Sequence, residues 1–260
     1  MGFLFDLALL RRAFDRTVDG GYRPGLANAV DADNGIDVRD IRVSYGRHRA
    51  LDRVSGRFAP GSLTAIVGPN GAGKTSLLDV LAGTRRPRRG TIVCAARGRR
   101  RLAYLPQQST LDREFPVTVG ELATLGLWRQ FGAFRAPSDA LKEQACAALA
   151  AVGLDGVVSR RIGALSAGQM QRALFARVML LDAEVILLDE PFAAVDERTT
   201  ADLLALVARW HAERRTVIAV LHDIAIVRAQ FPSTLLLART VVAWGETGAM
   251  LTDENLMRAV

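Results

Sequence analysis

The sequence predicts an α/β fold in which a parallel sheet is interrupted by a helical insert. Short apolar runs rich in β-branched residues are typical of buried strands, and they recur at residues 63–67, 185–188, 216–221 and 234–237. Segments with helical periodicity lie between these runs. Because strands that alternate with helices form a parallel sheet covered by those helices, we expect this architecture here.

Residues 1–35 differ from the rest and are expected to form an N-terminal extension. Apolar residues recur there at helical spacing, and a linker rich in Gly, Asp and Asn follows up to about Gly35. One interpretation is an amphipathic helix that lies on a membrane or on a partner subunit. The simpler one, which we favour, is a poorly ordered tail or a start codon assigned too early. The apolar positions are Phe3, Leu7, Leu10, Phe14 and Val18.

The main domain is expected at residues 36–255. Residues 36–43 alternate between apolar and polar side chains, which predicts a half-buried strand. Residues from about 117 to 153 are mostly helical in pattern, with Leu141, Ala145 and Leu149 on one face. We place the helical insert at about 108–180.

The chain is basic and uses arginine almost everywhere. It has 260 residues with a net charge of +7, and Lys74 and Lys142 are the only lysines among its 34 basic residues. Arginine runs at 85–89 and 97–101 suggest acidic partners, but no aromatic residues interleave with them for base stacking. We therefore interpret these runs as solvated hairpin arginines and expect no nucleic-acid partner.

The cysteine and hydropathy patterns indicate a cytoplasmic protein. Two cysteines, Cys94 and Cys146, are too few for a disulfide framework and fit a reducing compartment. No apolar run reaches the roughly 18 residues that a membrane span requires. Arg11 and Arg12 follow the first apolar residues, whereas a secretory signal has its positive charge before them.

A glycine-rich loop with the pattern G-x-x-x-x-G-K-[ST] lies between the strand at 63–67 and a helix that starts near Ser76. Its members are Gly68, Pro69, Asn70, Gly71, Ala72, Gly73, Lys74 and Thr75. Glycines let several backbone N–H groups turn toward phosphate oxygens, and the helix directs its positive dipole end to the same anion. Lys74 is expected to reach the β- and γ-phosphates, and Thr75 to hold Mg²⁺.

Asp189 and Glu190 directly follow the apolar strand 185–188. Open α/β sheets bind ligands at the carboxyl ends of their strands, so a buried strand delivers these carboxylates to that edge. Asp189 is then placed to hold Mg²⁺, and Glu190 to orient or deprotonate a water that attacks the γ-phosphate. Without the phosphate loop, the better interpretation would be a strand that ends in solvated acids.

Two further segments carry candidate site residues. Ser166, in Leu165-Ser166-Ala167-Gly168-Gln169, can cap the amphipathic helix after it, and it can also present donors to an anion. His222 follows another apolar strand and can donate to a phosphate oxygen or respond to its loss, although a lone histidine is more often structural. The scattered histidines and cysteines predict no transition-metal site.

Taken in this order, residues 36–250 closely resemble the nucleotide-binding subunit of the ATP-binding cassette (ABC) transporter family. The resemblance implies a P-loop NTPase with a RecA-like parallel-sheet core, an N-terminal antiparallel β subdomain and an inserted helical subdomain. It also implies ATP and Mg²⁺ as cofactors, bound by the loop and by Ser76, and an ATPase activity.

Three of the roles follow from the resemblance alone, and the role of His222 is made more specific by it. Tyr45 matches the aromatic residue that stacks on adenine, and Gln107 matches the glutamine that touches Mg²⁺ and the attacking water. Asp196 matches the loop that communicates across a cassette dimer, and His222 matches the switch histidine. The signature segment, with Ser166, Gly168 and Gln169, departs from the family pattern because Ala167 replaces its first glycine.

The resemblance also implies partners and a location. Two cassettes would enclose two ATP molecules, each held by one copy's phosphate loop and the other copy's signature helix. The homodimer would lie at the cytoplasmic face of the plasma membrane, bound to an integral-membrane permease that works with an extracytoplasmic metal-binding protein. Residues 109–119 and 190–196 look like those of bacterial zinc and manganese importers.

Other classes stay open at this point. Siderophore and haem importers are near alternatives for the cargo. A soluble cassette ATPase that acts on nucleic acid would explain the arginine runs, but neither a second cassette nor a long coiled-coil insert is present. A P-loop nucleotide kinase would leave residues 165–169 and Asp196 without a role.

Overall fold

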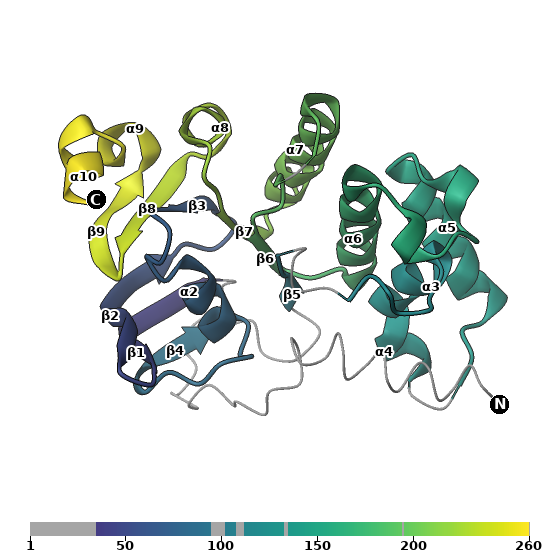
Figure 1. The fold of residues 1–260 in the computed structure, drawn as a ribbon, viewed down its shortest axis with the longest axis horizontal. Coiled ribbons are helices and arrows are strands. Elements are labelled where there is room, and N and C mark those ends of the chain that lie inside the picture. Colours follow the sequence, from purple (N-terminus) through teal and green to yellow (C-terminus); the bar gives the residue numbers. More distant parts are fainter. Residues whose placement is uncertain (1–34, 95–101, 108–111, 133–134, 194, 260) are drawn as a thin grey trace.

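The computed structural model describes residues 35–94, 102–107, 112–132, 135–193 and 195–259 (Figure 1). It contains two sheets and a group of helices inserted between two strands of the larger sheet. The helical pattern expected at Phe3 to Val18 lies outside the described residues, as do Arg97 to Arg101.

The smaller sheet is antiparallel and has the strand order β2-β1-β4. Its strands are β1 (Ile36–Tyr45), β2 (His48–Phe58) and β4 (Arg89–Cys94). Apolar residues of β1 point inward, while polar residues between them face outward, as the alternation predicted. Asp40 and Arg53 adopt positive φ angles of 49° and 52°, close to shifts in the β1–β2 register.

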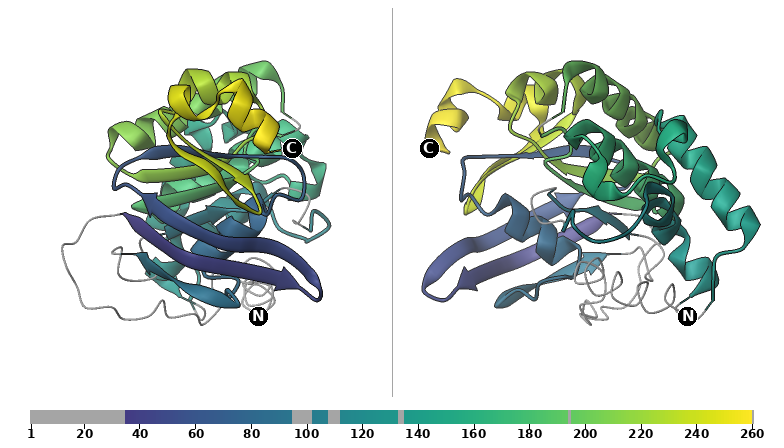
Figure 2. Two further views of the ribbon diagram at one scale, coloured as in Figure 1. Left: turned by 90° about the vertical axis from the view of Figure 1, so that its left-hand side faces the viewer. Right: turned by 45° about the vertical axis from the view of Figure 1, so that its right-hand side comes forward.

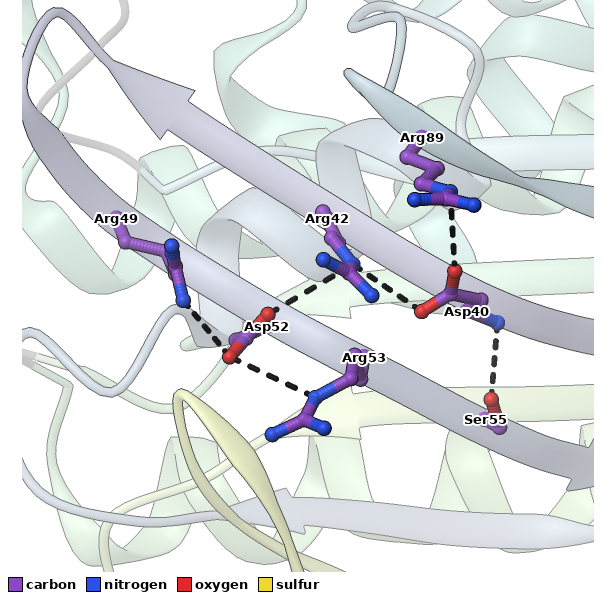
Figure 3. Close-up of polar contacts among 7 residues, drawn as sticks. All are labelled: Asp40, Arg42, Arg49, Asp52, Arg53, Ser55 and Arg89. Carbon is purple, nitrogen blue, oxygen red and sulfur yellow. Dashed lines mark hydrogen bonds and ion pairs between the residues drawn. The ribbon is translucent and has the colours of Figure 1, made fainter.

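Ion pairs cover part of the small sheet (Figure 3). Asp52 lies 2.9 Å from Arg49 and 3.8 Å from both Arg42 and Arg53. Asp40 pairs with Arg42 at 3.2 Å and with Arg89 at 3.5 Å. The arginines of these pairs are largely solvent-accessible, although Asp52 is mostly buried, and such pairs contribute little to stability, so the carboxylates mainly offset the repulsion among the arginines.

The larger sheet has the order β5-β6-β7-β3-β8-β9, in which β9 alone is antiparallel to its neighbour. Every residue of β3, β6 and β7 is buried, which explains their continuous apolar runs. The strands are β3 (Leu63–Val67), β5 (Leu102–Leu105), β6 (Val185–Asp189), β7 (Thr216–Val220), β8 (Ser233–Ala238) and β9 (Thr240–Glu246).

Helices occupy much of the chain between β5 and β6 and lie apart from the small sheet in Figure 1. These are α3 (Val119–Thr124), α4 (Trp128–Phe131), α5 (Asp139–Ala151) and α6 (Ala167–Leu181), with short 3₁₀ turns at Leu125–Leu127, Asp155–Val157 and Ile162–Ala164. The remaining helices are α2 (Lys74–Leu81), α7 (Glu197–Ala212), α8 (Ile224–Gln230), α9 (Thr247–Met250) and α10 (Asp253–Arg258). No helix in these described ranges is long and apolar enough to cross a membrane.

The two faces of the large sheet border two hydrophobic cores. Leu63, Ala65 and Val67 of β3 pack into the core that also contains the inserted helices. Ile66 points to the other face and packs with α2 and the small sheet. Helix α2 therefore lies between the two sheets, as the views in Figure 2 also show, and this fixes the loop that precedes it.

The predicted α/β class and the strands at 63–67, 185–188, 216–221 and 234–237 are confirmed. The sequence did not single out β2, β4, β5 or β9, because their polar positions or short lengths hide the alternation. The domain bounds at 36–255 and the insert bounds at about 108–180 stay predictions.

The stacking of Phe175 on Trp210 generates a test of the fold. Their rings lie 5.6 Å apart at 10° and join α6 to α7, and Phe175 is completely buried. Phe175→Ala should lower the free energy of unfolding by about 3–5 kcal/mol, because it leaves a cavity between the two helices. Urea unfolding followed by circular dichroism measures the loss. The exposed Met257→Ala is the control, and equal stabilities for the two variants would contradict this packing.

Candidate active site

The glycine-rich loop leaves β3, and its last two residues, Lys74 and Thr75, begin α2 directly after Gly73. Gly73 has a φ of 92°, and a Cβ atom there would collide with the backbone of Ala50 on β2. Glycine is therefore required for both conformation and space. Among the described residues, no side chain caps the N-terminus of α2, so its first N–H groups are available to bind an anion.

Lys74 lies inside this loop. Its Nζ donates hydrogen bonds to the carbonyl oxygens of Gly68 at 2.8 Å and Pro69 at 2.9 Å, and the residue is only 6% exposed. Burial lowers the pKa of Lys74, while the nearby carboxylates of Glu190 and Asp189 oppose this shift. The ammonium is thus held where phosphate oxygens can replace the two carbonyls as its partners.

Asp189 is a buried carboxylate at the end of β6. It is 1% exposed, and within the described part of the chain neither of its oxygens accepts a hydrogen bond of standard geometry. Burial raises its pKa to about 6; the hydroxyl of Thr75 opposes the shift, while the charges of Glu190 and Asp79 add to it. A buried carboxylate that lacks a hydrogen bond of standard geometry to the described residues, beside a threonine hydroxyl, offers the oxygen donors that Mg²⁺ prefers, so these residues fit that ion.

Glu190 lies between a glutamine and a histidine. Gln107 Nε2 donates to Glu190 Oε2 at 2.7 Å, and His222 Nε2 lies 2.6 Å from Glu190 Oε1. The three side chains follow β5, β6 and β7, which are neighbours in the sheet, so their ends meet at one edge. Glu190 has a φ of 49°, and its N–H donates to the carbonyl of Val220 at 3.2 Å.

Ser166 and Gln169 form a reciprocal cap on α6. Gln169 N donates to Ser166 Oγ, and Ser166 N donates to Gln169 Oε1, both at 3.1 Å. The carboxamide of Gln169 is thus engaged by its own helix, while the exposed Ser166 hydroxyl retains its proton for an outside acceptor. Capping and anion binding are compatible here.

Asp196 lies with the signature segment and caps α7. Its two carboxylate oxygens accept from Thr199 N at 2.8 Å and Thr199 Oγ1 at 2.9 Å, and these bonds lower its pKa. Arg172 of α6 donates to the same Thr199 hydroxyl at 2.8 Å.

Figure 1 shows α2 and α6 on opposite sides of β5 and β6. The predicted residues therefore form two groups, one around Lys74 and one around Ser166.

Two contacts in the site were missed from the sequence. Arg85, interpreted as a solvated arginine, instead places its guanidinium 4.2 Å from the ring centre of Tyr45. Gln171 lies on α6 and is 1% exposed. Its side chain donates to the carbonyl oxygen of Pro191, the residue directly after Glu190, at 2.6 Å. A polar residue among the apolar positions of α6 was the only sequence signal for Gln171.

Comparison with known proteins identifies the family of this chain. Residues 51–193 match the family described as ABC transporter. The chain is 35% identical to the manganese transport system ATP-binding protein MntB of Listeria monocytogenes over 86% of its own length and 95% of that protein's. It is 34% identical to the zinc transport system ATP-binding protein TroB of Treponema pallidum over 86% of each.

The chain therefore belongs to the ABC transporter family, as one of its ATP-binding, ATP-hydrolysing subunits. Solved structures share its fold. A protein described as a metal-chelate type ABC transporter in an inward-facing conformation is 28% identical, with a TM-score of 0.77 over 86% of this chain and 88% of that one. A dimeric bacterial ABC transporter cassette is 23% identical, with a TM-score of 0.73 over 82% and 98%.

The buried carboxylate of Asp189 predicts a pH dependence of stability. Its pKa in the fold, about 6, lies above the ordinary value of 3.8. The folded chain therefore loses stability as the pH rises through this window, and Asp189→Asn should remove the loss. With EDTA and no nucleotide, the variant should be more stable than the parent by up to about 3 kcal/mol at pH 8 and nearly equal to it at pH 4.

Urea unfolding at both pH values measures this difference. The exposed Asp202→Asn is the matched control and should behave like the parent. If Asp189→Asn differs from the parent in stability by the same amount at pH 4 and pH 8, burial does not raise the pKa of this carboxylate.

The Gln171–Pro191 hydrogen bond generates a second prediction. Gln171→Leu leaves the Pro191 carbonyl without this donor and should cost about 1–3 kcal/mol of stability. Because Pro191 follows Glu190, kcat for ATP hydrolysis should fall more than the affinity for ATP changes. Gln230→Leu, at the exposed end of α8, is the control. A fall in ATP affinity with unchanged kcat would contradict this role.

Proposed function

We propose that this chain hydrolyses ATP to power the import of manganese or zinc through a separate membrane permease. The observation that supports hydrolysis is the carboxylate of Glu190, held by Gln107 and His222 beside the loop of Lys74. The support for the cargo is the similarity to ATP-binding proteins of manganese and zinc transport systems.

In this proposal the loop residues and Lys74 hold the triphosphate. Ser76, in the first turn of α2, binds the nucleotide with them. Thr75, Asp189 and Gln107 would hold Mg²⁺, which neutralises charge on the phosphates when bound. Glu190 orients the attacking water and accepts its proton, while the contact from His222 keeps the carboxylate turned toward the γ-phosphate. Tyr45 stacks on the adenine base.

The separation of the two residue groups supports a homodimer. Ser166 and Gly168 lie with Asp196 rather than with Lys74, and among the described residues the Ser166 hydroxyl, at a helix N-terminus, only accepts a hydrogen bond. Two copies would complete each site by donating these groups to the nucleotide on the other copy. The dimer would bind the permease at the cytoplasmic face of the membrane, and an extracytoplasmic metal-binding protein would supply the cargo.

A second candidate is the import of an iron chelate such as a siderophore or haem. The solved structure described as a metal-chelate type transporter favours it, at 28% identity. Action on nucleic acid is the weaker alternative, because several arginines of the small sheet pair with Asp40 and Asp52 instead of forming an unpaired cationic patch.

Replacement of the proposed base should separate ATP binding from hydrolysis. Glu190→Gln keeps the size of the side chain but cannot accept the proton, so kcat should fall by about 10²–10⁴-fold. ATP should still bind and should trap a dimer that size-exclusion chromatography detects. The exposed Glu254→Gln is the control. Normal turnover by Glu190→Gln would reject Glu190 as the base.

Uptake of radioactive metal tests the cargo. Cells that lack the gene should lose high-affinity uptake of manganese or zinc, and the intact gene should restore it while the Glu190→Gln gene should not. Unchanged uptake of both metals together with lost uptake of an iron chelate would favour the second candidate. The purified protein should show no salt-dependent DNA binding with ATPase stimulation.

A further inference from the structure

Tyr45 is held at two points of its side chain. Its hydroxyl lies 3.1 Å from Ser76 Oγ in the first turn of α2, and the guanidinium of Arg85 lies over its ring at 4.2 Å. The residue is nevertheless 43% exposed, although large apolar side chains of the described fold are mostly buried. With its hydroxyl edge fixed and the guanidinium over the ring, the surface of Tyr45 that stays exposed is available to a planar ligand.

Arg85 is itself placed by the end of α2. Its backbone N–H donates to the carbonyl oxygen of Asp79 at 3.1 Å, beside the bond from Thr84 N at 3.0 Å. The guanidinium Nε lies 3.9 Å from Asp79 Oδ2 and is buried without a hydrogen bond to the described residues. The charge contact with Asp79 and the Tyr45 ring therefore locate this cation.

Asp79 is in turn anchored in the interior. Its Oδ1 accepts from Thr84 Oγ1 and from the hydroxyl of Tyr104, both at 3.3 Å. Tyr104 is buried on β5, next to the strand that ends in Asp189. The contacts thus run from the core through Asp79 and Arg85 to the exposed ring of Tyr45.

We propose that Arg85 is a positioning residue that holds Tyr45 as a rigid platform, so that the nucleotide base stacks on the ring face opposite the guanidinium. The inference rests on the proposed stacking of adenine on Tyr45 and adds a residue that sets its geometry. Of the two anchors of the ring, Ser76 belongs to α2 and Arg85 to the turn that follows it, where its N–H is bonded to the Asp79 carbonyl of α2. The base site is therefore held at a constant distance from the phosphate loop.

The physical gain is preorganisation. A cation over an aromatic face attracts the ring quadrupole, and a ring already held in place loses little freedom when a base stacks on it. The opposite arrangement is a guanidinium that occupies the place of the base and must be displaced by it. The two arrangements predict opposite signs for the loss of Arg85, because removing a competitor would tighten binding.

A double-mutant cycle tests the inference. The dissociation constants of ATP and of inorganic tripolyphosphate are measured by calorimetry for the parent, Arg85→Ala, Tyr45→Ala and the double variant. Arg85→Ala should weaken ATP binding about 3–10-fold. It should leave tripolyphosphate binding unchanged, because that ligand has no base. In the Tyr45→Ala background, Arg85→Ala should have no further effect.

Two further variants control for charge and folding. Arg88→Ala removes an exposed arginine from the same turn and should leave both dissociation constants unchanged. Arg85→Lys keeps a cation over the ring and should restore part of the ATP affinity. Circular dichroism confirms that each variant is folded.

The outcomes separate this inference from the proposed function. Tighter ATP binding by Arg85→Ala, an equal loss for tripolyphosphate, or an undiminished effect without Tyr45 would each overturn the role of Arg85. If Tyr45→Ala weakens ATP binding but Arg85→Ala does not, the platform fails while base stacking stands. If Tyr45→Ala leaves ATP binding unchanged, base stacking on Tyr45 fails as well.

Discussion

The site depends on the hydrogen-bonded carboxylate of Glu190. Gln107 and His222 each contact one of its oxygens, and the three residues follow three adjacent parallel strands. This arrangement requires the sheet order β5-β6-β7, which brings together residues far apart in the chain. A shift of any one of these strands would separate the Glu190 carboxylate from a partner. The partly buried charge would then lose a hydrogen bond.

The position of α2 between two cores constrains the phosphate loop in the same way. Leu77 and Leu78 pack against the small sheet and one face of the large one, while Gly73 allows close contact with β2. The small sheet is therefore part of the support of the loop, in addition to carrying Tyr45. Burial around Lys74 and Asp189 shifts both pKa values toward the neutral forms, which a bound triphosphate and cation would reverse.

The local part of the site could be predicted residue by residue. The loop from Gly68 to Thr75 and the acids after strand β6 are contiguous in sequence, and each has a spacing that its chemistry requires. The roles of Tyr45, Gln107 and Asp196 came from a family resemblance, because no local pattern distinguishes them. Arg85 was misinterpreted, since its partner Tyr45 is 40 positions away and a run of arginines looks solvated.

The sequence by itself determined the α/β class, the buried strands and the phosphate-binding chemistry, because hydrophobic periodicity and loop spacing are local properties of the chain. Only the tertiary structure decided which strand ends are neighbours, and hence that Gln107 and His222 hold Glu190. It also decided that Gln171 reaches Pro191 and that Arg85 covers Tyr45. These contacts join segments that are far apart in the sequence. They form, and their side chains become buried, only when the whole chain has packed.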